Sequence, residues 1–317
     1  MRAAPLVSGL FLVAAVSPLL AQTPECTGYN GDAQRVCAAA VDGTRAFHPL
    51  IGVLVSGGNP TIGSAGALGL GHASLTLRAN AVQVVLPDLA YTGSGTTVPA
   101  GDKLWVPAPL LEGSLGLFKG VGNGLLALDL LGSAQLLPTD QISNLTVDST
   151  ARQIGGIALG LGYGARIGLL SERGPLPAVS VSVMRRDIPE ITYGDVPGGD
   201  RFSYGVDLHA TNLRLVASKN LLLLDLAAGL GWDKYTGDAV IRFRDPITNL
   251  AQPDVPVKLN SSRVLGFLNA GMSLSVVRLT AEVGYQGGKD QNLSTDFQDF
   301  DTTKGKFFAG LGLRVGF

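Results

Sequence analysis

The sequence predicts an all-β protein: a transmembrane antiparallel β-barrel of about 10–12 strands, within a range of roughly 10–14, preceded by a short helical or plug-like segment. Three observations support this fold class. Several segments alternate strictly between apolar and small or polar residues. Long polar connections alternate along the chain with tight turns. The composition is also too apolar for an ordinary soluble protein that lacks membrane helices.

The first element is an export signal over residues 1–21. Arg2 provides a positive start, and the apolar stretch from Leu6 to Leu20 has a length typical of signal peptides. Ala21 is the expected last residue before cleavage. The mature chain then divides into an N-terminal segment, 22–65, and a barrel, 66–317.

The mature chain is apolar without containing a candidate membrane helix. The full chain has a mean hydropathy of +0.29, and only 15% of its residues are charged, against about 25% in soluble domains. After the signal, no stretch reaches the roughly 18 unbroken apolar residues of a spanning helix. The net charge of −1 argues against a nucleic-acid surface, which needs clustered cations.

The last strand shows the alternation most clearly. Apolar side chains occupy every odd position from Phe307 to Phe317, while glycine or arginine fills most even positions. Successive strand residues point to opposite faces, so one face is continuously apolar. Similar segments lie at 126–136, 157–169, 222–233 and 277–286. Their lengths suit the ~9–11 tilted residues that cross a bilayer.

The connections between these strands alternate in length. The long ones are 87–107, 138–151, 187–200, 235–258 and 288–304, and the short ones are 119–123, 171–176, 218–220 and 273–275. Long extracellular loops and short periplasmic turns are the rule for membrane barrels. We therefore expect ten spanning strands from about residue 66 onward. The strand near 202–216 changes phase after Ala210, which predicts a bulge there.

The N-terminal segment, 22–65, lacks the alternating pattern of the barrel strands. Cys26 and Cys37 are expected to form a disulfide in an oxidising periplasm, with two reduced thiols as the alternative. Asp32 to Arg45 is typical of a helix. The apolar stretch 47–65 either adds one or two strands or folds inside the barrel, and we favour a lumenal or barrel-closing segment.

The inward faces of the predicted strands carry charges of both signs. A lumenal polar network is expected from Glu112, Asp129, Arg166, Asp207, Asp225, Arg278, Glu282 and Arg314. Mixed signs favour a closed, salt-bridged interior over an ion-selective ring, and a polar constriction along a permeation path is the alternative. Tyr163, Trp232 and Tyr285 lie where an interfacial aromatic girdle is expected.

No residue pattern predicts catalysis. The histidines, His48, His72 and His209, lie in no nucleophile motif such as G-x-S-x-G. Glycines that resemble a phosphate loop lie within strands, whereas a dinucleotide loop joins a strand to a helix. We expect no enzyme, no cofactor and no metal.

The terminal Phe317 resembles the C-terminal signature of bacterial outer-membrane barrels. That resemblance implies a place in the cell outer membrane, contact with outer-membrane lipid, and recognition of Phe317 by the barrel-assembly machinery as an assembly signal. The layout of signal, N-terminal segment with Gly57, Gly58 and Asn59, barrel and terminal Phe317 is similar to FadL-type hydrophobic-compound transporters.

Two functions compete. One is passive transport of small molecules, which the apolar N-terminal segment and a glycine-lined lumen favour; hydrophobic molecules are one class of such substrates. The other is a non-transporting structural or surface-interaction barrel that acts through its long extracellular loops. An apolar pocket beside the N-terminal segment would favour transport, and a closed, salt-bridged interior would favour the second function. The sequence specifies neither a substrate nor an oligomeric state.

Overall fold

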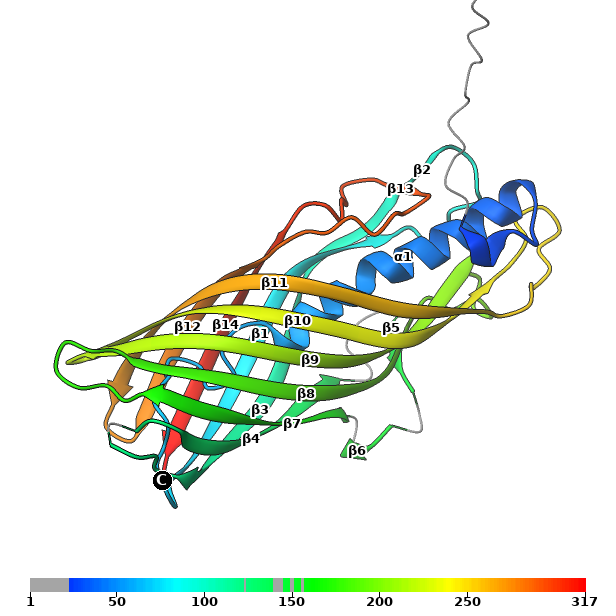
Figure 1. Ribbon diagram of the computed structural model, residues 1–317. Helices are drawn as coiled ribbons and strands as arrows, with labels where there is room; N and C mark the ends of the chain where they lie inside the picture. Colours follow the sequence, from blue (N-terminus) through cyan, green and yellow to red (C-terminus); the bar gives the residue numbers. More distant parts are fainter. Residues whose placement is uncertain (1–22, 123, 139–144, 149–150, 155–156) are drawn as a thin grey trace, which may run out of the picture.

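The computed structural model describes residues 23–122, 124–138, 145–148, 151–154 and 157–317. The predicted signal, 1–21, lies outside these residues. Within them, ten antiparallel strands close into a barrel (Figure 1). In order around the ring they are β8 (Ala178–Tyr193), β9 (Phe202–Leu221), β10 (Leu224–Phe243), β11 (Val255–Leu274), β12 (Val277–Gln286), β14 (Lys306–Gly316), β1 (Ala73–Pro87), β3 (Ala100–Phe118), β4 (Ala127–Pro138) and β7 (Ile157–Leu170), which pairs back with β8.

Shorter elements complete the chain. They are η1 (Pro24–Cys26), α1 (Gly31–Ser56), β2 (Thr97–Val98), β5 (Leu145–Val147), β6 (Gln153–Ile154) and β13 (Asp296–Phe297). β2 pairs in parallel with β13 and so joins two long connections at one end of the barrel. We call this the loop end. The opposite end, which carries the tight turns and the C-terminus, is the turn end (Figure 1).

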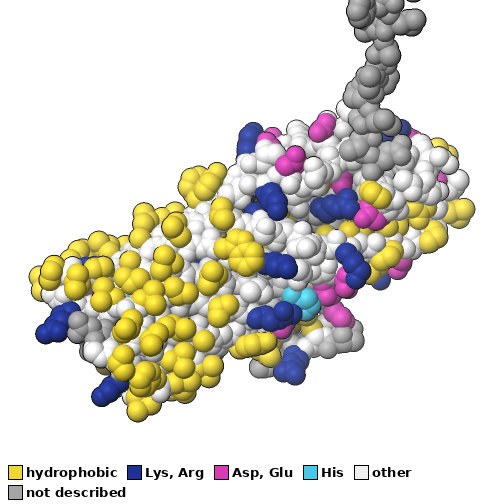
Figure 2. Space-filling view, viewed as in Figure 1, with side chains coloured by type: hydrophobic (Ala, Val, Ile, Leu, Met, Phe, Trp, Pro, Cys, Tyr) yellow, Lys and Arg dark blue, Asp and Glu magenta, His cyan; other side chains and the backbone are white. Residues whose placement is uncertain are grey.

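The predicted alternation of faces is confirmed. In β14, Phe307 and Leu311 are 65% and 62% exposed, whereas Phe308, Gly310 and Arg314 are buried. Exposed apolar side chains gather over the part of the barrel nearest the turn end (Figure 2). Such a continuous apolar band on an outward face is the surface that a barrel presents to lipid.

β10 shows where the apolar band ends. Its outward side chains are apolar from Leu224 to Trp232 and polar from Lys234 to Asp238. The apolar part matches the ~9–11 residues that cross a bilayer. Trp232 therefore marks the interface on the loop side. The expected girdle residues Tyr163 and Tyr285 are also exposed, as are Trp105 and Phe307.

Beyond this interface the inward faces become apolar. In β10, Asp233 is followed on the same face by Tyr235, Ala239, Ile241 and Phe243, all buried. These side chains belong to the core cluster that includes α1. The loop-end half of the barrel is thus packed like a soluble domain, with water outside and an apolar core inside.

This arrangement corrects the prediction of a bulge near Ala210. The even positions of β9 face inward along the whole strand, from Phe202 through Ala210 to Arg214. The apolar pattern changes face there because the apolar partner changes from lipid to α1. The register shift lies instead in β8, between Ile188 and Ile191.

No helix in the described part of the chain is both long enough and apolar enough to span a bilayer. The predicted helix of 32–45 begins at Gly31 and continues through Pro49 to Ser56. It lies inside the loop-end half of the barrel (Figure 1). In this structure α1 lies in the lumen, and β1 begins at Ala73 rather than near residue 66.

A charge test separates the two halves of the outward surface. We expect Leu279→Arg to lower the free energy of unfolding by about 2–4 kcal/mol, because Leu279 lies within the lipid-facing band. The matched variant Val240→Arg, on the outward face of β10 beyond Trp232, should change stability little. Urea unfolding in lipid vesicles measures both, and equal costs would contradict the assigned band.

Candidate functional site in the filled lumen

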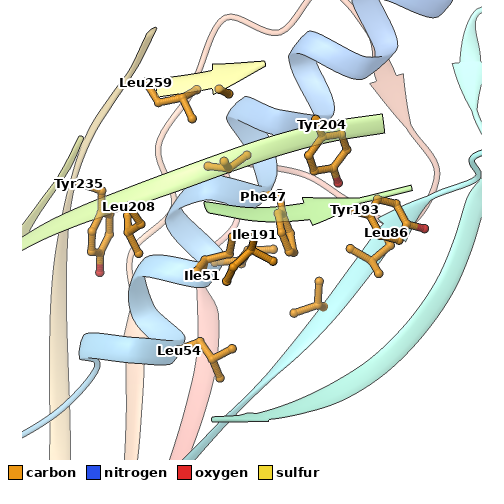
Figure 3. Close-up of a cluster of buried hydrophobic side chains, with 14 of the residues drawn as sticks. Phe47, Ile51, Leu54, Leu86, Ile191, Tyr193, Tyr204, Leu208, Tyr235 and Leu259 are labelled. Carbon is orange, nitrogen blue, oxygen red and sulfur yellow. The ribbon is translucent and has the colours of Figure 1, made fainter. Parts of the chain in front are cut away.

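Apolar contacts hold α1 inside the loop-end half of the lumen. The ring of Phe47 packs edge-on against Tyr204, with centroids 5.9 Å apart. Ile51 and Leu54 face neighbouring wall residues (Figure 3). A Cβ at Gly52 would lie only 2.6 Å from the ring of Tyr235. The absence of a side chain at Gly52 therefore allows the helix to approach the wall.

One disulfide and one set of hydrogen bonds hold the first half of α1 in place. The predicted disulfide between Cys26 and Cys37 is present and joins η1 to the helix. The buried Asp42 accepts hydrogen bonds from the backbone N–H and hydroxyl of Ser294, both at 2.8 Å, and from Thr295 N–H at 3.0 Å. The long connection between β12 and β14 is thereby bound to the helix.

The C-terminus of α1 is capped by two arginines of the wall. Arg214 donates to the carbonyls of Ser56 and Gly58, each at 2.8 Å. Arg78 donates to the carbonyls of Gly57, at 2.8 Å, and Asn59, at 2.7 Å. The last carbonyls of a helix have no partner within the helix and carry its negative dipole end, so cations are favoured there.

Each capping arginine is itself paired with a buried carboxylate. Arg214 forms an ion pair with Asp233, and Arg78 with Glu282. The hydroxyl of Tyr235 donates to Asp233 at 2.7 Å. All four charged side chains are buried, and such charges are stable only when paired and hydrogen-bonded.

The network extends further around the wall. Glu112 lies 3.2 Å from Arg186 and 3.7 Å from Arg78. Arg186 also donates to Asn212, whose amide donates to Asp233 at 2.9 Å. The polar groups of β1, β3, β8, β9, β10 and β12 thus form one connected layer across the lumen at the end of the helix.

Below this layer, residues 57–72 run through the lumen to the turn end. We call them the plug segment. Its backbone donates to Asn269 from Gly63 at 3.0 Å and to Ser218 from Ala65 at 2.8 Å. Leu68 N–H donates to Asp129 at 3.2 Å, and Asp129 pairs with Arg166 at 2.6 Å. The plug segment is therefore hydrogen-bonded to the wall along its length.

Most of the predicted lumenal residues contribute to this interior. Glu112, Asp129, Arg166 and Glu282 are buried in the ion pairs described above. Asp225 pairs with Arg278 at 2.8 Å near the turn end. Arg314 is also buried, but no ion pair of its side chain is found among the described residues.

Asp207 is the exception, since it faces outward. It lies on the same face of β9 as His209, whose Nδ1 is 2.7 Å from Asp187. The reason is again the change of solvent: beyond the apolar band, a polar outward residue meets water. In the described part of the chain, no cluster of His, Cys, Asp or Glu has the grouping of a metal site.

The prediction missed four buried arginines: Arg78, Arg186, Arg214 and Arg263. For two of these arginines, the neighbouring residues in the sequence indicate an inward position. Arg78 stands between the outward Leu77 and Ala79, and Arg214 between Leu213 and Leu215. A lone arginine flanked by lipid-facing residues must point into the lumen, because successive strand residues alternate.

The hollows in the filled lumen differ in character on the two sides of the charged layer. An apolar cavity of about 70 Å³ lies beside α1. Every residue that lines it is apolar: Phe47, Ile51, Leu54, Val55, Val84, Leu86, Val106, Pro107, Ala108, Leu136, Leu137, Val147 and Ile191. A smaller one of about 20 Å³ adjoins it toward the loop end and shares Phe47 and Leu86. At the turn end, a polar hollow of about 260 Å³ is lined in part by Gly66, Asp225 and Arg278.

The terminal Phe317 continues the outward apolar face of β14 and is 72% exposed. Its backbone N–H and carbonyl both pair with Ala73, at 2.9 and 3.1 Å, at the seam that closes the ring. Its reading as an assembly signal remains a prediction.

Comparison with known proteins identifies no family for this chain. No family model and no curated protein matches the chain. Among solved structures, the outer-membrane protease OmpT of Escherichia coli is 10% identical, with a TM-score of 0.38 over 78% of this chain and 96% of that one. The translocator domain of the autotransporter NalP from Neisseria meningitidis is 11% identical, with a TM-score of 0.40 over 78% and 88%. The N-terminal barrel domain of Pseudomonas aeruginosa OprF is 12% identical, with a TM-score of 0.29 over 78% and 99%.

These matches, with TM-scores of 0.40 or less, carry no argument about the fold or the activity of this chain. The closed antiparallel ring and its outward apolar band themselves identify the chain as a barrel of the bacterial outer-membrane type. The similarity to FadL-type transporters stays a prediction.

The capping role of Arg214 can be tested by substitution. We expect Arg214→Met to lower the free energy of unfolding by about 3–5 kcal/mol, because it leaves Asp233 buried without its cation. The double variant Arg214→Met/Asp233→Leu should recover only part of this loss, since the carbonyls of Ser56 and Gly58 still lack donors. Urea unfolding measures the stability, and amide hydrogen exchange of α1 reports the capping directly.

The control is Arg185→Met, a change of the same kind at an exposed site. It should alter neither stability nor exchange. Full recovery in the double variant would show that Arg214 serves only to neutralise Asp233.

Proposed function

We propose that this protein is an outer-membrane barrel that takes up small apolar molecules, with the loop end facing the outside of the cell. The apolar cavity beside α1 would receive the molecule. The observation that carries the proposal is the lining of that cavity, which contains no polar side chain although the layer next to it is densely charged. Ligand sites are typically concave and mostly apolar.

The size of the cavity limits what can enter. At about 70 Å³, it is smaller than an engineered cavity of about 150 Å³ that admits benzene. In this conformation it suits the narrow end of a hydrocarbon chain. A wider molecule would require Phe47, which also borders the smaller cavity toward the loop end, to change rotamer.

Passage inward would require the plug segment to move. The charged layer and the hydrogen bonds of residues 57–72 separate the apolar cavity from the polar hollow at the turn end. The barrel in this conformation is closed to free diffusion. Uptake would therefore be gated, with the plug segment as the moving part.

A second candidate function is a non-transporting barrel that acts at the cell surface. The specific observation in its favour is the same closed interior, together with a wall that continues beyond the apolar band. On this alternative, the apolar cavity is only a packing defect beside α1 and nothing crosses the barrel.

Binding in the cavity can be tested with cis-parinaric acid, a linear hydrocarbon chain whose fluorescence rises in apolar surroundings. We expect the purified protein to bind this probe saturably, and Ala108→Phe to weaken binding by about tenfold, because Ala108 is an inward-facing, buried residue of the lining. Ala309→Phe, on the lipid-facing side of β14, is the matched control and should bind as the unmodified protein does. If Ala108→Phe and Ala309→Phe bind the probe equally well, the probe does not bind in the apolar cavity.

Gating can be tested with a removable cross-link. A Cβ at Gly66 would lie 3.9 Å from that of Ala178, which suits a disulfide, whose mean Cβ separation is about 3.8 Å. In intact Gram-negative cells that carry Gly66→Cys/Ala178→Cys, we expect slow entry of the same probe when the pair is oxidised and normal entry after reduction. Cells with Gly66→Cys alone control for the effect of the reductant on the native disulfide.

Normal entry with the cross-link formed would show that entry does not require the plug segment to move. If the unmodified protein does not speed entry at all, the second candidate function is favoured.

A further inference from the structure

Another hollow, separate from those described above, lies between α1, β11 and the connection from β12 to β14. It measures about 250 Å³. Its lining residues are Arg45, His48, Lys258, Leu259, Asn260, Ser261, Arg263, Lys289, Asp290, Gln291 and Asn292. This set shares no residue with the lining of the apolar cavity.

The hollow exists because β12 is much shorter than β11. β12 ends at Gln286, which pairs with Leu265, and the last bond of this edge runs from Gly287 N–H to the carbonyl of Val264 at 2.9 Å. The rest of β11, toward the loop end, has no pairing with β12. Its inward side chains Ser261 and Arg263 therefore lie at an opening in the wall.

The charges that line the hollow do not balance. Four Lys or Arg side chains face one carboxylate, Asp290. Arg45 is neutralised by Glu25 at 2.7 Å and Asp42 at 3.3 Å, outside the lining. Lys258 has an exposed partner, Asp238.

Arg263 and Lys289 remain without a carboxylate partner among the described residues. Arg263 is only 5% exposed, and the one hydrogen bond found for it in this part of the chain runs from Nη1 to the Ser262 carbonyl at 3.2 Å. A buried cation without a counter-charge is costly.

Polar atoms next to this guanidinium also lack partners. His48 Nε2, Ser261 Oγ and Gln291 Nε2 are buried and have no hydrogen-bond partner in the described structure. Unsatisfied buried polar groups are rare in folded proteins and call for an explanation. A bound anion would supply acceptors for Arg263, Lys289, Ser261 and Gln291 together.

We propose that this hollow binds a phosphate group, held by Arg263 and Lys289. The planar guanidinium matches two phosphate oxygens, and the lysine adds a point charge on a flexible stem. The hollow lies just beyond the interface, since Val264 is exposed and apolar, and Ser262 and Asn260 are the next outward residues of β11 toward the loop end. That level suits the headgroup of a membrane lipid, and a free phosphate could reach the hollow from the loop end.

The test uses the full protein in a neutral detergent. Calorimetric titration with inorganic pyrophosphate probes the free anion, and native mass spectrometry with phosphatidylglycerol, against phosphatidylcholine, probes the lipid. We expect saturable binding in at least one arm and a loss of about tenfold or more in Arg263→Gln, because a charge-assisted hydrogen bond contributes roughly 1.5–3 kcal/mol. Arg242→Gln, an exposed arginine paired with Asp254 at 3.3 Å, removes the same charge elsewhere and should bind normally.

Binding of phosphatidylglycerol alone identifies a lipid headgroup site, and binding of pyrophosphate identifies a site open to free phosphate. If Arg263→Gln does not fold, Lys289→Gln on the exposed connection gives the same comparison with an intact wall. The proposal is overturned if neither probe binds saturably, or if the pocket variants bind as well as Arg242→Gln.

Discussion

The structure depends on how the end of α1 is satisfied inside the lumen. A helix that ends within a protein leaves its last carbonyls without partners, and buried carbonyls need donors. Arg214 donates to Ser56, Arg78 to the C-cap residue Gly57, and Asn80 to Leu54. Each arginine then needs a carboxylate, and Glu282 and Asp233 hold further groups of the plug segment and the wall. The charged layer, the position of the helix and the closed lumen therefore follow from one requirement.

The same strands have opposite polarity in the two halves of the barrel, because the surroundings of their faces differ. Near the turn end, lipid covers the outside, so the wall is apolar outward and polar inward. Near the loop end, water covers the outside and α1 fills the inside, so the polarity reverses while the backbone alternation continues. The plug segment and the charged layer lie in the first half, and the apolar cavity lies beside the helix that fills the second.

Sequence reasoning succeeded where a strand has one apolar neighbour throughout. β12 and β14 contact lipid along their length, and their faces could be assigned residue by residue. It failed at Asp207 and Ala210, because periodicity reports which face is apolar and not whether lipid or protein covers it. The ion pairs of Arg78 and Arg214 could not be predicted either, since their partners lie at the end of a helix that the sequence indicated only as far as Arg45.

The path of the N-terminal segment connects the filling of the lumen to the seam that closes the ring. Thr23 contacts Ser294 at the loop end, while Gly71 pairs with Gly116 at the turn end. Residues 23–72 thus thread the whole ring, and the ring closes between β1, which directly follows them, and β14, the last strand. The helix is thus continuous in the chain with one of the two seam strands, and Arg78 on that strand donates to the residue that caps the helix, Gly57. Filling of the lumen therefore stabilises the seam itself, and loss of the helix would weaken the ring at the point where its first and last strands meet.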